Sequence, residues 1–218
     1  YLSIKPTSLG LEVDYDLAYE NIKKLITHAR ELGLWVRLDM ENSPYTTQTL
    51  DLYRQYRSEG LDNCGIVLQA YMKRSEDDVR AVADLKPNIR LCKGIYNESP
   101  KIAYKDFHAV QENYKKLLRM IIDHDCFPAI ATHDEALILD ALDLINERGL
   151  ERDQYEFQML LGVREERRDQ LLKEGHPLRV YVPYGEDWYG YSTRRLKENP
   201  QMAGHIIKSI FSFNKKNK

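Results

Sequence analysis

The sequence lacks the patterns that mark several large classes of protein. It has three cysteines in 218 residues, and Cys64, Cys92 and Cys126 are not spaced as metal ligands, so neither a disulfide framework nor a zinc site is predicted. There is no G-x-G-x-x-G or G-x-x-x-x-G-K-[ST] motif, which excludes the common dinucleotide and P-loop sites. No serine or cysteine accompanies a His-Asp pattern, and the histidines are not spaced as metal ligands.

Charge of one sign and long apolar runs are also missing. The 34 acidic residues nearly balance the 32 basic ones, and a net charge of -2 favours neither nucleic acid nor a membrane as partner. No apolar run approaches the roughly 18 residues of a spanning helix, and no signal peptide is recognised. We therefore expect a cytoplasmic protein with buried thiols and a small-molecule partner. The final FSFNKKNK is expected to be a frayed basic tail, with contact to an anionic membrane surface as the alternative.

Short apolar runs rich in β-branched residues alternate with longer segments of helical periodicity. The short runs predict strands at residues 2–5, 35–39, 65–69, 89–93, 129–132, 155–160 and 179–182. Helices are predicted at about residues 16–32, 47–59, 75–85, 104–125, 135–148 and 165–174, then a helix with an arginine pair and a last one at 201–213. Strict alternation of this kind is typical of a parallel sheet with crossover helices.

The position of the polar residues decides between an open sheet and a barrel. An open sheet concentrates its site at one switch point, whereas a barrel collects groups from the carboxyl ends of many strands. Here polar groups follow six of the seven predicted strands: Lys5, Asp39, Glu41, Gln69, Tyr71, Lys93, Tyr96, Thr132, His133 and Tyr184. We therefore predict a (β/α)8 TIM-like barrel and treat residues 1–218 as one catalytic barrel domain. Seven strands are one short of closure, so we expect the first strand and the helices before it to be absent from this sequence.

The segment YGEDWYGYSTRRLKENP places four polar residues on one face of a predicted helix. Tyr191, Arg194, Arg195 and Glu198 stand at i, i+3, i+4 and i+7. Two adjacent guanidiniums suit a planar anion, either a carboxylate or a phosphate, because each is a rigid fork of donors. A solvated arginine pair is the alternative.

Two further segments have more than one interpretation. Thr132 and His133 end a strand and open a helix, where backbone N–H groups favour a phosphate, but Asp134 is also a natural helix N-cap. Lys93 is a candidate Schiff-base nucleophile, phosphate ligand or flavin neighbour, or an ordinary surface lysine. Gly94 beside it permits close approach of the backbone to a large planar or phosphate-bearing ligand.

In combination these residues describe a site for a small amino acid. Lys5 and the arginine pair would neutralise a carboxylate, Tyr191 would supply a flat wall and Asp39 would balance the positive charge. A pairing of Lys5 with Asp39 for stability alone is the other interpretation. Since no strong nucleophile or metal cluster is evident, the chemistry is expected to belong to a cofactor.

The sequence resembles a known family, the proline dehydrogenases, in particular the short monofunctional bacterial type. The resemblance covers nearly the whole sequence in the ordered blocks SIKPTSLG, RLDMEN, LQAY, RLCKGIY, ATHD, EFQMLLGVR, VYVPYG and WYGYSTRRLKENP. It implies a flavin enzyme on a (β/α)8 barrel that uses FAD to oxidise L-proline to Δ1-pyrroline-5-carboxylate, the first step of proline catabolism. The electrons would pass to a quinone, for which a peripheral membrane contact would give access.

The resemblance also implies roles for individual residues. The catalytic group would be Lys5, Asp39, Arg194 and Arg195, with Asp39 pairing with Lys5. Lys5 and the arginine pair would hold the proline carboxylate, and Glu198 would position the arginines. The walls around the proline ring would be Tyr96, Leu160 and Tyr191. The residues expected at FAD are Gln69, Arg90 and Lys93 beside the isoalloxazine, Gly94 next to them, and Thr132 and His133 near the remainder of the cofactor.

Two alternatives stay open at this stage. The first is a lysine-dependent barrel enzyme, a Schiff-base aldolase or a PLP enzyme that uses Lys93. The second is an inactive truncated barrel that survives as a folding or association module, since an open edge would expose unpaired strand groups.

Overall fold

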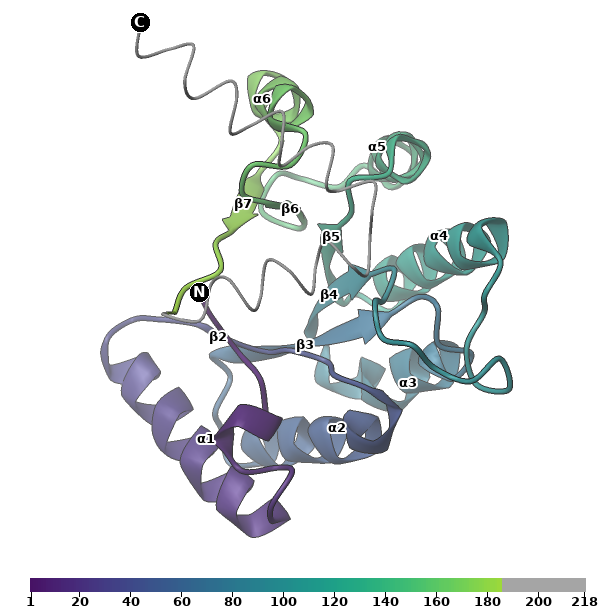
Figure 1. The fold of residues 1–218 in the computed structure, drawn as a ribbon. Helices are drawn as coiled ribbons and strands as arrows, with labels where there is room; N and C mark the ends of the chain where they lie inside the picture. The colour runs from purple at the N-terminus through teal and green to yellow at the C-terminus, as the bar shows by residue number, and fades with distance from the viewer. Residues whose placement is uncertain (186–218) are drawn as a thin grey trace, which may run out of the picture.

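In the described part of the chain, seven parallel strands form one curled sheet and pair in the order in which they occur in the sequence (Figure 1). The computed structural model describes residues 1–185. The strands are β1 (Leu2–Ile4), β2 (Val36–Leu38), β3 (Cys64–Gln69), β4 (Asn88–Cys92), β5 (Phe127–Ala131), β6 (Glu156–Leu160) and β7 (Leu178–Tyr181). All seven predicted strands are confirmed, with bounds that differ by one or two residues.

Helices connect successive strands on the outer side of the curl (Figure 1). They are α1 (Tyr15–Glu31), α2 (Ser43–Ser58), α3 (Ser75–Val82), α4 (Phe107–Asp123), α5 (Glu135–Arg148) and α6 (Glu165–Lys173), with short 3-10 turns η1 (Thr7–Leu9) and η2 (Ala83–Leu85). The predicted arginine-pair helix and the helix at 201–213 lie outside the described residues.

Capping residues explain where several helices begin. The side chains of Asp14, Asp106 and Asp134 accept backbone N–H groups in the first turns of α1, α4 and α5. The prediction for α4 was wrong by three residues, because Asp106 caps a helix that begins at Phe107 rather than at residue 104. The prediction for α2 was four residues late, because Pro44 fits the first turn of a helix and does not delay it.

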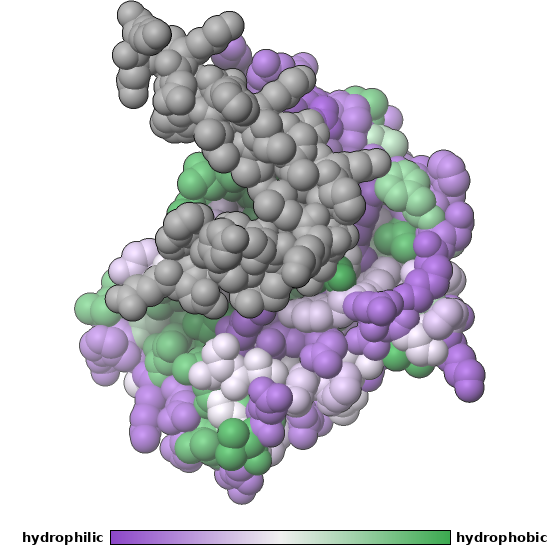
Figure 2. Space-filling view, in the orientation of Figure 1, coloured by the Kyte–Doolittle hydropathy of each residue, from purple (hydrophilic) through white to green (hydrophobic). Residues whose placement is uncertain are grey.

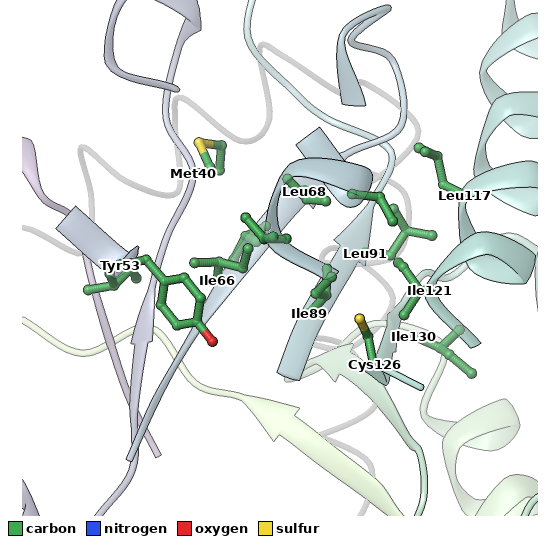
Figure 3. Packing of buried hydrophobic residues seen from close by; sticks show 14 of the residues in the cluster. Met40, Tyr53, Ile66, Leu68, Ile89, Leu91, Leu117, Ile121, Cys126 and Ile130 are labelled. Atoms are coloured by element: carbon green, nitrogen blue, oxygen red, sulfur yellow. The ribbon is translucent and has the colours of Figure 1, made fainter. Parts of the chain in front are cut away.

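The hydrophobic core lies between the sheet and the helix layer (Figure 3). In β4, Ile89 and Leu91 are fully buried against this layer, and Leu117 and Ile121 of α4 are equally buried on the facing side. Each such side chain contributes about 1.5–3 kcal/mol through the apolar surface it removes from water. The same alternation directs Arg90, between Ile89 and Leu91, to the inner side of the curl.

The two edges of the described sheet, β1 and β7, approach each other. The Arg179 guanidinium lies 3.4 Å from the centre of the Tyr1 ring, and the Tyr181 hydroxyl lies 3.5 Å from Oδ2 of Asp39. The sheet therefore curves round on itself, and the fold is α/β and barrel-like.

The outer surface mixes polar and apolar side chains. Figure 2 shows hydrophilic residues interspersed with smaller hydrophobic patches over the visible face, as is usual where a domain surface meets water. None of the described helices combines the length and the apolar character needed to cross a membrane. All three thiols are free; Cys64 and Cys126 are buried as predicted, whereas Cys92 is half-buried.

Candidate active site

An ion pair inside the curl joins β4 to the end of β2, and these two strands do not neighbour each other. Nη1 of Arg90 in β4 lies 2.7 Å from Oδ1 of Asp39, which directly follows β2. The Ser3 hydroxyl of β1 donates to the same Oδ1 at 2.7 Å and accepts from Arg90 at 3.1 Å. The arginine and aspartate side chains are only 10% and 15% exposed, so water screens their attraction poorly.

The Arg90 guanidinium also contacts β6, so the polar contacts continue along the inner face of the sheet toward β7. Arg90 Nε donates to Oε1 of Gln158 in β6 at 2.6 Å, and the Gln158 amide donates to Glu156 at 2.5 Å. Arg179 of β7 then pairs with Glu156 at 2.9 Å. Together with Ser3 and Asp39 these residues form an interior polar chain from β1 to β7.

Four members of the interior polar chain were not predicted as site residues from the sequence: Ser3, Glu156, Gln158 and Arg179. A signal was present in the block EFQML, since Glu156 and Gln158 stand two apart in a predicted strand and so share one face. Polar residues repeated on the inner face of a barrel strand indicate a polar interior.

The predicted partner of Asp39 is corrected by the structure. We expected Lys5, but Asp39 is paired with Arg90. Lys5 follows β1 with an exposed side chain, and within residues 1–185 its ammonium makes no hydrogen bond or ion pair. Arg90 pairs with Asp39 because its planar donors can contact Asp39, Ser3 and Gln158 at the same time.

Lys93 and Arg90 lie in different surroundings. Lys93 forms an ion pair with Asp134 at the start of α5 and lies 4.3 Å from the centre of the Phe107 ring. Gln111 donates to the same Asp134 oxygen at 2.7 Å. Burial raises the pKa of Asp134, but the hydrogen bonds from Lys93 and Gln111 outweigh it, and the net pKa lies below the usual value.

The helix N-cap interpretation of Asp134 is confirmed. Oδ1 of Asp134 accepts the Ala136 N–H at 3.0 Å, and the Asp134 N–H in turn donates to Thr132 Oγ1 at 3.1 Å. The His133 ring accepts the Leu160 N–H at 2.9 Å, which joins the ends of β5 and β6. One of the N–H groups considered for a phosphate is therefore already satisfied within the protein.

Gln69 and Tyr71 complete the rim at the end of β3. Gln69 is 3% exposed, and its amide donates to the Glu41 carbonyl at 2.9 Å. Gly94 has a φ of +101°, and a Cβ at that position would overlap the Tyr71 ring. Glycine is therefore needed there for both the turn and the close packing.

The structure thus gathers most of the predicted site residues at one end of the sheet. The residues concerned are Lys5, Asp39, Gln69, Lys93, Gly94, Tyr96, Thr132, His133 and Leu160, which follow or end strands β1 to β6, and Arg90, which lies within β4. Tyr191, Arg194, Arg195 and Glu198 lie outside the described residues. Within the described range, no group of His, Cys, Asp or Glu side chains is arranged to hold a metal ion.

A parallel curled sheet with charged and polar groups at the carboxyl ends of its strands defines an α/β barrel-type enzyme fold. The sequence model of one family, described as proline dehydrogenase, matches residues 2–207. The chain belongs to the proline dehydrogenase family.

Curated relatives support this membership along almost the whole chain. Proline dehydrogenase 2 of Bacillus subtilis (strain 168) is 42% identical over 210 residues, which cover 96% of this chain and 69% of that protein. Proline dehydrogenase of Deinococcus radiodurans R1 is 39% identical over 214 residues, with the same coverage.

Solved structures show the same fold. Proline utilization A (PutA) from Bdellovibrio bacteriovorus superposes with a TM-score of 0.82 at 23% identity, over 89% of this chain and 24% of that one. A PutA mutant from Bradyrhizobium japonicum gives a TM-score of 0.81 at 23% identity, over 95% of this chain and 24% of its own length. The chain therefore spans about a quarter of each PutA chain.

Proposed function

We propose that this protein is an enzyme that oxidises L-proline to Δ1-pyrroline-5-carboxylate, the first step of proline catabolism. The observation that carries the proposal is the match of residues 2–207 to the proline dehydrogenase family, with relatives of that name about 40% identical over 96% of the chain. The polar end of the sheet supports it, because the family resemblance assigns site residues to the strand ends that meet there.

The proposed cofactor is a flavin, specifically FAD, which when bound supplies the acceptor for the two electrons that leave a substrate C–H bond as the C–N single bond becomes a C=N double bond. The donors present fit such a group. Arg90 offers a guanidinium and Gln69 an amide inside the curl, and Lys93 offers an ammonium at the rim. These three residues would hold the ring system, with Gly94 next to them. Thr132 and His133 would lie by the remainder.

The protein's own residues would bind and orient the substrate. We assign the carboxylate to Lys5, Arg194 and Arg195, with Glu198 positioning the arginine pair. The exposed side chain of Lys5 supports its part, because no ion pair with the described residues occupies its ammonium. Cationic neighbours also lower the pKa of a bound amine, which favours the neutral nitrogen that the oxidation requires.

Three side chains would enclose the proline ring, namely Tyr96, Leu160 and Tyr191. Holding the ring against a planar acceptor converts an encounter of two molecules into an oriented reaction within one complex. Asp39 would act by fixing the Arg90 guanidinium, to which it is paired at 2.7 Å.

The proposal includes several finer assignments. The electrons would pass to a quinone, and a peripheral membrane contact would give the protein access to it. Residues 1–218 would belong to one catalytic domain of the (β/α)8 TIM-like barrel type, in the cytoplasm. A lysine-dependent mechanism gains no support, because Lys93 is engaged in an ion pair with Asp134 and is not presented as a free amine.

The first test is the absorption spectrum of the FAD-supplemented protein before and after L-proline is added without oxygen. We expect flavin bands at about 370 and 450 nm, and bleaching of the second band by L-proline. Bound flavin that is indifferent to L-proline would contradict the proposed substrate, and the absence of bound flavin would contradict the proposed cofactor.

The carboxylate assignment has its own prediction. Arg195→Met should lower kcat/KM for L-proline at least about 30-fold, because removing one partner of a buried charged hydrogen bond costs about 2 kcal/mol or more. Steady-state kinetics with an artificial electron acceptor measure it. Arg54→Met, which changes a surface arginine paired with Asp84, is the control and should leave kcat/KM unchanged. Equal kcat/KM values for the Arg195 variant and the wild type would refute the assignment.

A further inference from the structure

The loop between β4 and α4, residues 93–106, carries Tyr96, one of the proposed walls around the substrate ring. Its return half is fastened to the end of β3 by backbone contacts. Lys73 N donates to Ile102 O at 2.9 Å, Tyr104 N donates to Tyr71 O at 2.7 Å, and Met72 and Ala103 form an antiparallel bridge. That half therefore has a fixed place relative to the sheet.

The other half of the loop is fastened through a side chain. The Glu98 carboxylate accepts the Ser43 N–H at 2.6 Å through Oε1 and the Ser43 hydroxyl at 2.8 Å through Oε2. Ser43 is the first residue of α2, whose N-cap residue Asn42 makes no side-chain capping bond. Glu98 therefore caps α2 from a loop 55 residues away in sequence. Its negative charge also faces the positive end of the helix dipole.

Tyr96 lies two residues before this carboxylate and is joined to it through the backbone. Glu98 N donates to Tyr96 O at 3.1 Å, and the Tyr96 side chain is half-buried against Tyr71, Met72 and Ala103. Gly94 and Tyr71 fix the start of the loop by their close packing. The loop segment from residue 94 to 98 is thus held at its start by packing and at its end by the Glu98–Ser43 pair.

We propose that Glu98 is a positioning residue that, through its two hydrogen bonds to Ser43, fixes Tyr96 at the substrate and so sets the affinity for the substrate ring. The proposal rests on the proposed function for the identity of the substrate. Glu98 contacts Ser43, so its effect passes through the loop. Loss of the pair should weaken substrate binding more than it slows the oxidation of bound substrate.

The experiment compares Glu98→Ala, Glu98→Gln and Ser43→Ala in the full chain with FAD. For L-proline we expect Glu98→Ala to raise KM about tenfold with kcat changed less than twofold. Glu98→Gln should give a smaller rise, because its amide oxygen can still accept one hydrogen bond. The double variant with Ser43→Ala should be no worse than Glu98→Ala alone, because Glu98→Ala already removes the hydrogen bond that the Ser43 hydroxyl makes. Glu166→Gln, an exposed carboxylate on α6, is the matched control.

Hydrogen exchange measured by mass spectrometry supplies a readout that does not depend on turnover. Glu98→Ala should speed exchange in the peptide containing residues 94–98 and at the start of α2, with the α5 peptide unchanged. A KM within twofold of the wild type in Glu98→Ala, while Tyr96→Ala raises KM, would overturn the proposal even if exchange increased. If the wild-type protein does not oxidise L-proline, the proposed function fails. If hydrogen exchange in residues 94–98 of Glu98→Ala is then also the same as in the wild type, the Glu98–Ser43 pair does not hold the loop in place.

Discussion

The site depends at the residue scale on one guanidinium that three strands share. Arg90 of β4 contacts Ser3, Asp39 and Gln158, and all of these contacts are within 3.1 Å. A buried charge is tolerated only when partners surround it, so each partner is needed to keep the others in place.

Removing Asp39 should therefore damage stability as well as catalysis. Asp39→Ala leaves the Arg90 charge without its carboxylate in a poorly hydrated interior, and we expect a loss of about 3–5 kcal/mol in the free energy of unfolding. Urea denaturation followed by circular dichroism measures this. Asp84→Ala breaks the exposed pair with Arg54 and should cost less than about 1 kcal/mol. Equal losses of unfolding free energy in the two variants would show that the interior Asp39–Arg90 pair stabilises the fold no more than the exposed pair does.

The same residues show why sequence alone found the site but not its contacts. Polar side chains after successive strands identified Lys5 and Asp39 as neighbours of one region, and the family resemblance added Arg90. Sequence could not specify that Asp39 pairs with Arg90 across the curl instead of with Lys5 on the adjacent strand. That choice depends on the curvature of the sheet and on side-chain reach, and neither leaves a periodic pattern in the sequence.

At the scale of elements, α5 shows one side chain serving both a helix and the site. Asp134 caps α5 through Ala136 with one oxygen and contacts Lys93 and Gln111 with the other. Strands and helices with strong periodicity were found from the sequence. The start of α2 was missed although Pro44 stands in its first turn, because Asn42 makes no capping bond and the cap is instead Glu98 from a distant loop.

The two functions of Asp134 can be separated by two substitutions. Asp134→Ala should lower the free energy of unfolding by about 1–2 kcal/mol through loss of the cap. Asp134→Asn keeps a capping oxygen and loses the ion pair with Lys93, so it should cost less than Asp134→Ala. Thermal unfolding of both variants measures the difference, and a larger loss for Asp134→Asn would contradict this division.

The pKa of Asp134 also predicts how these differences depend on pH. Since its pKa is lowered in the folded state, the unfolded chain binds the proton more readily as the pH falls. The stabilisation is therefore complete above the ordinary aspartate range and is lost as the pH falls through the folded pKa. The wild type and Asp134→Ala should accordingly converge in stability in acid.

At the scale of the whole molecule, the interior polar chain connects strands that the backbone ladder leaves apart. β1 and β7 are the edges of the sheet. The interior polar chain crosses between these two edges, from Ser3 through Asp39, Arg90, Gln158 and Glu156 to Arg179. Such a network should behave as one unit in unfolding experiments.

A double-mutant cycle tests this unit. Arg90→Met and Glu156→Gln change residues that are linked through Gln158, so their effects on the free energy of unfolding should deviate from additivity by about 0.5–3 kcal/mol. Urea titrations of the two single variants and the double variant give the coupling. Arg90→Met combined with Glu112→Gln on the surface of α4 should be additive, and additivity in both cycles would refute a connected interior.

The order of the strands in the sheet also bears on how the chain is made. Because β1 pairs with β2, β2 with β3, and so on to β7, each described strand after β1 meets a neighbour synthesised just before it as it leaves the ribosome. None of the seven described strands has to wait for a partner encoded at the far end of the message, and this shortens the loops that close early in folding. The sheet can grow during translation by addition to one edge, and the contacts of Asp39 with Arg90 and of Arg90 with Gln158 form only as β4 and β6 arrive.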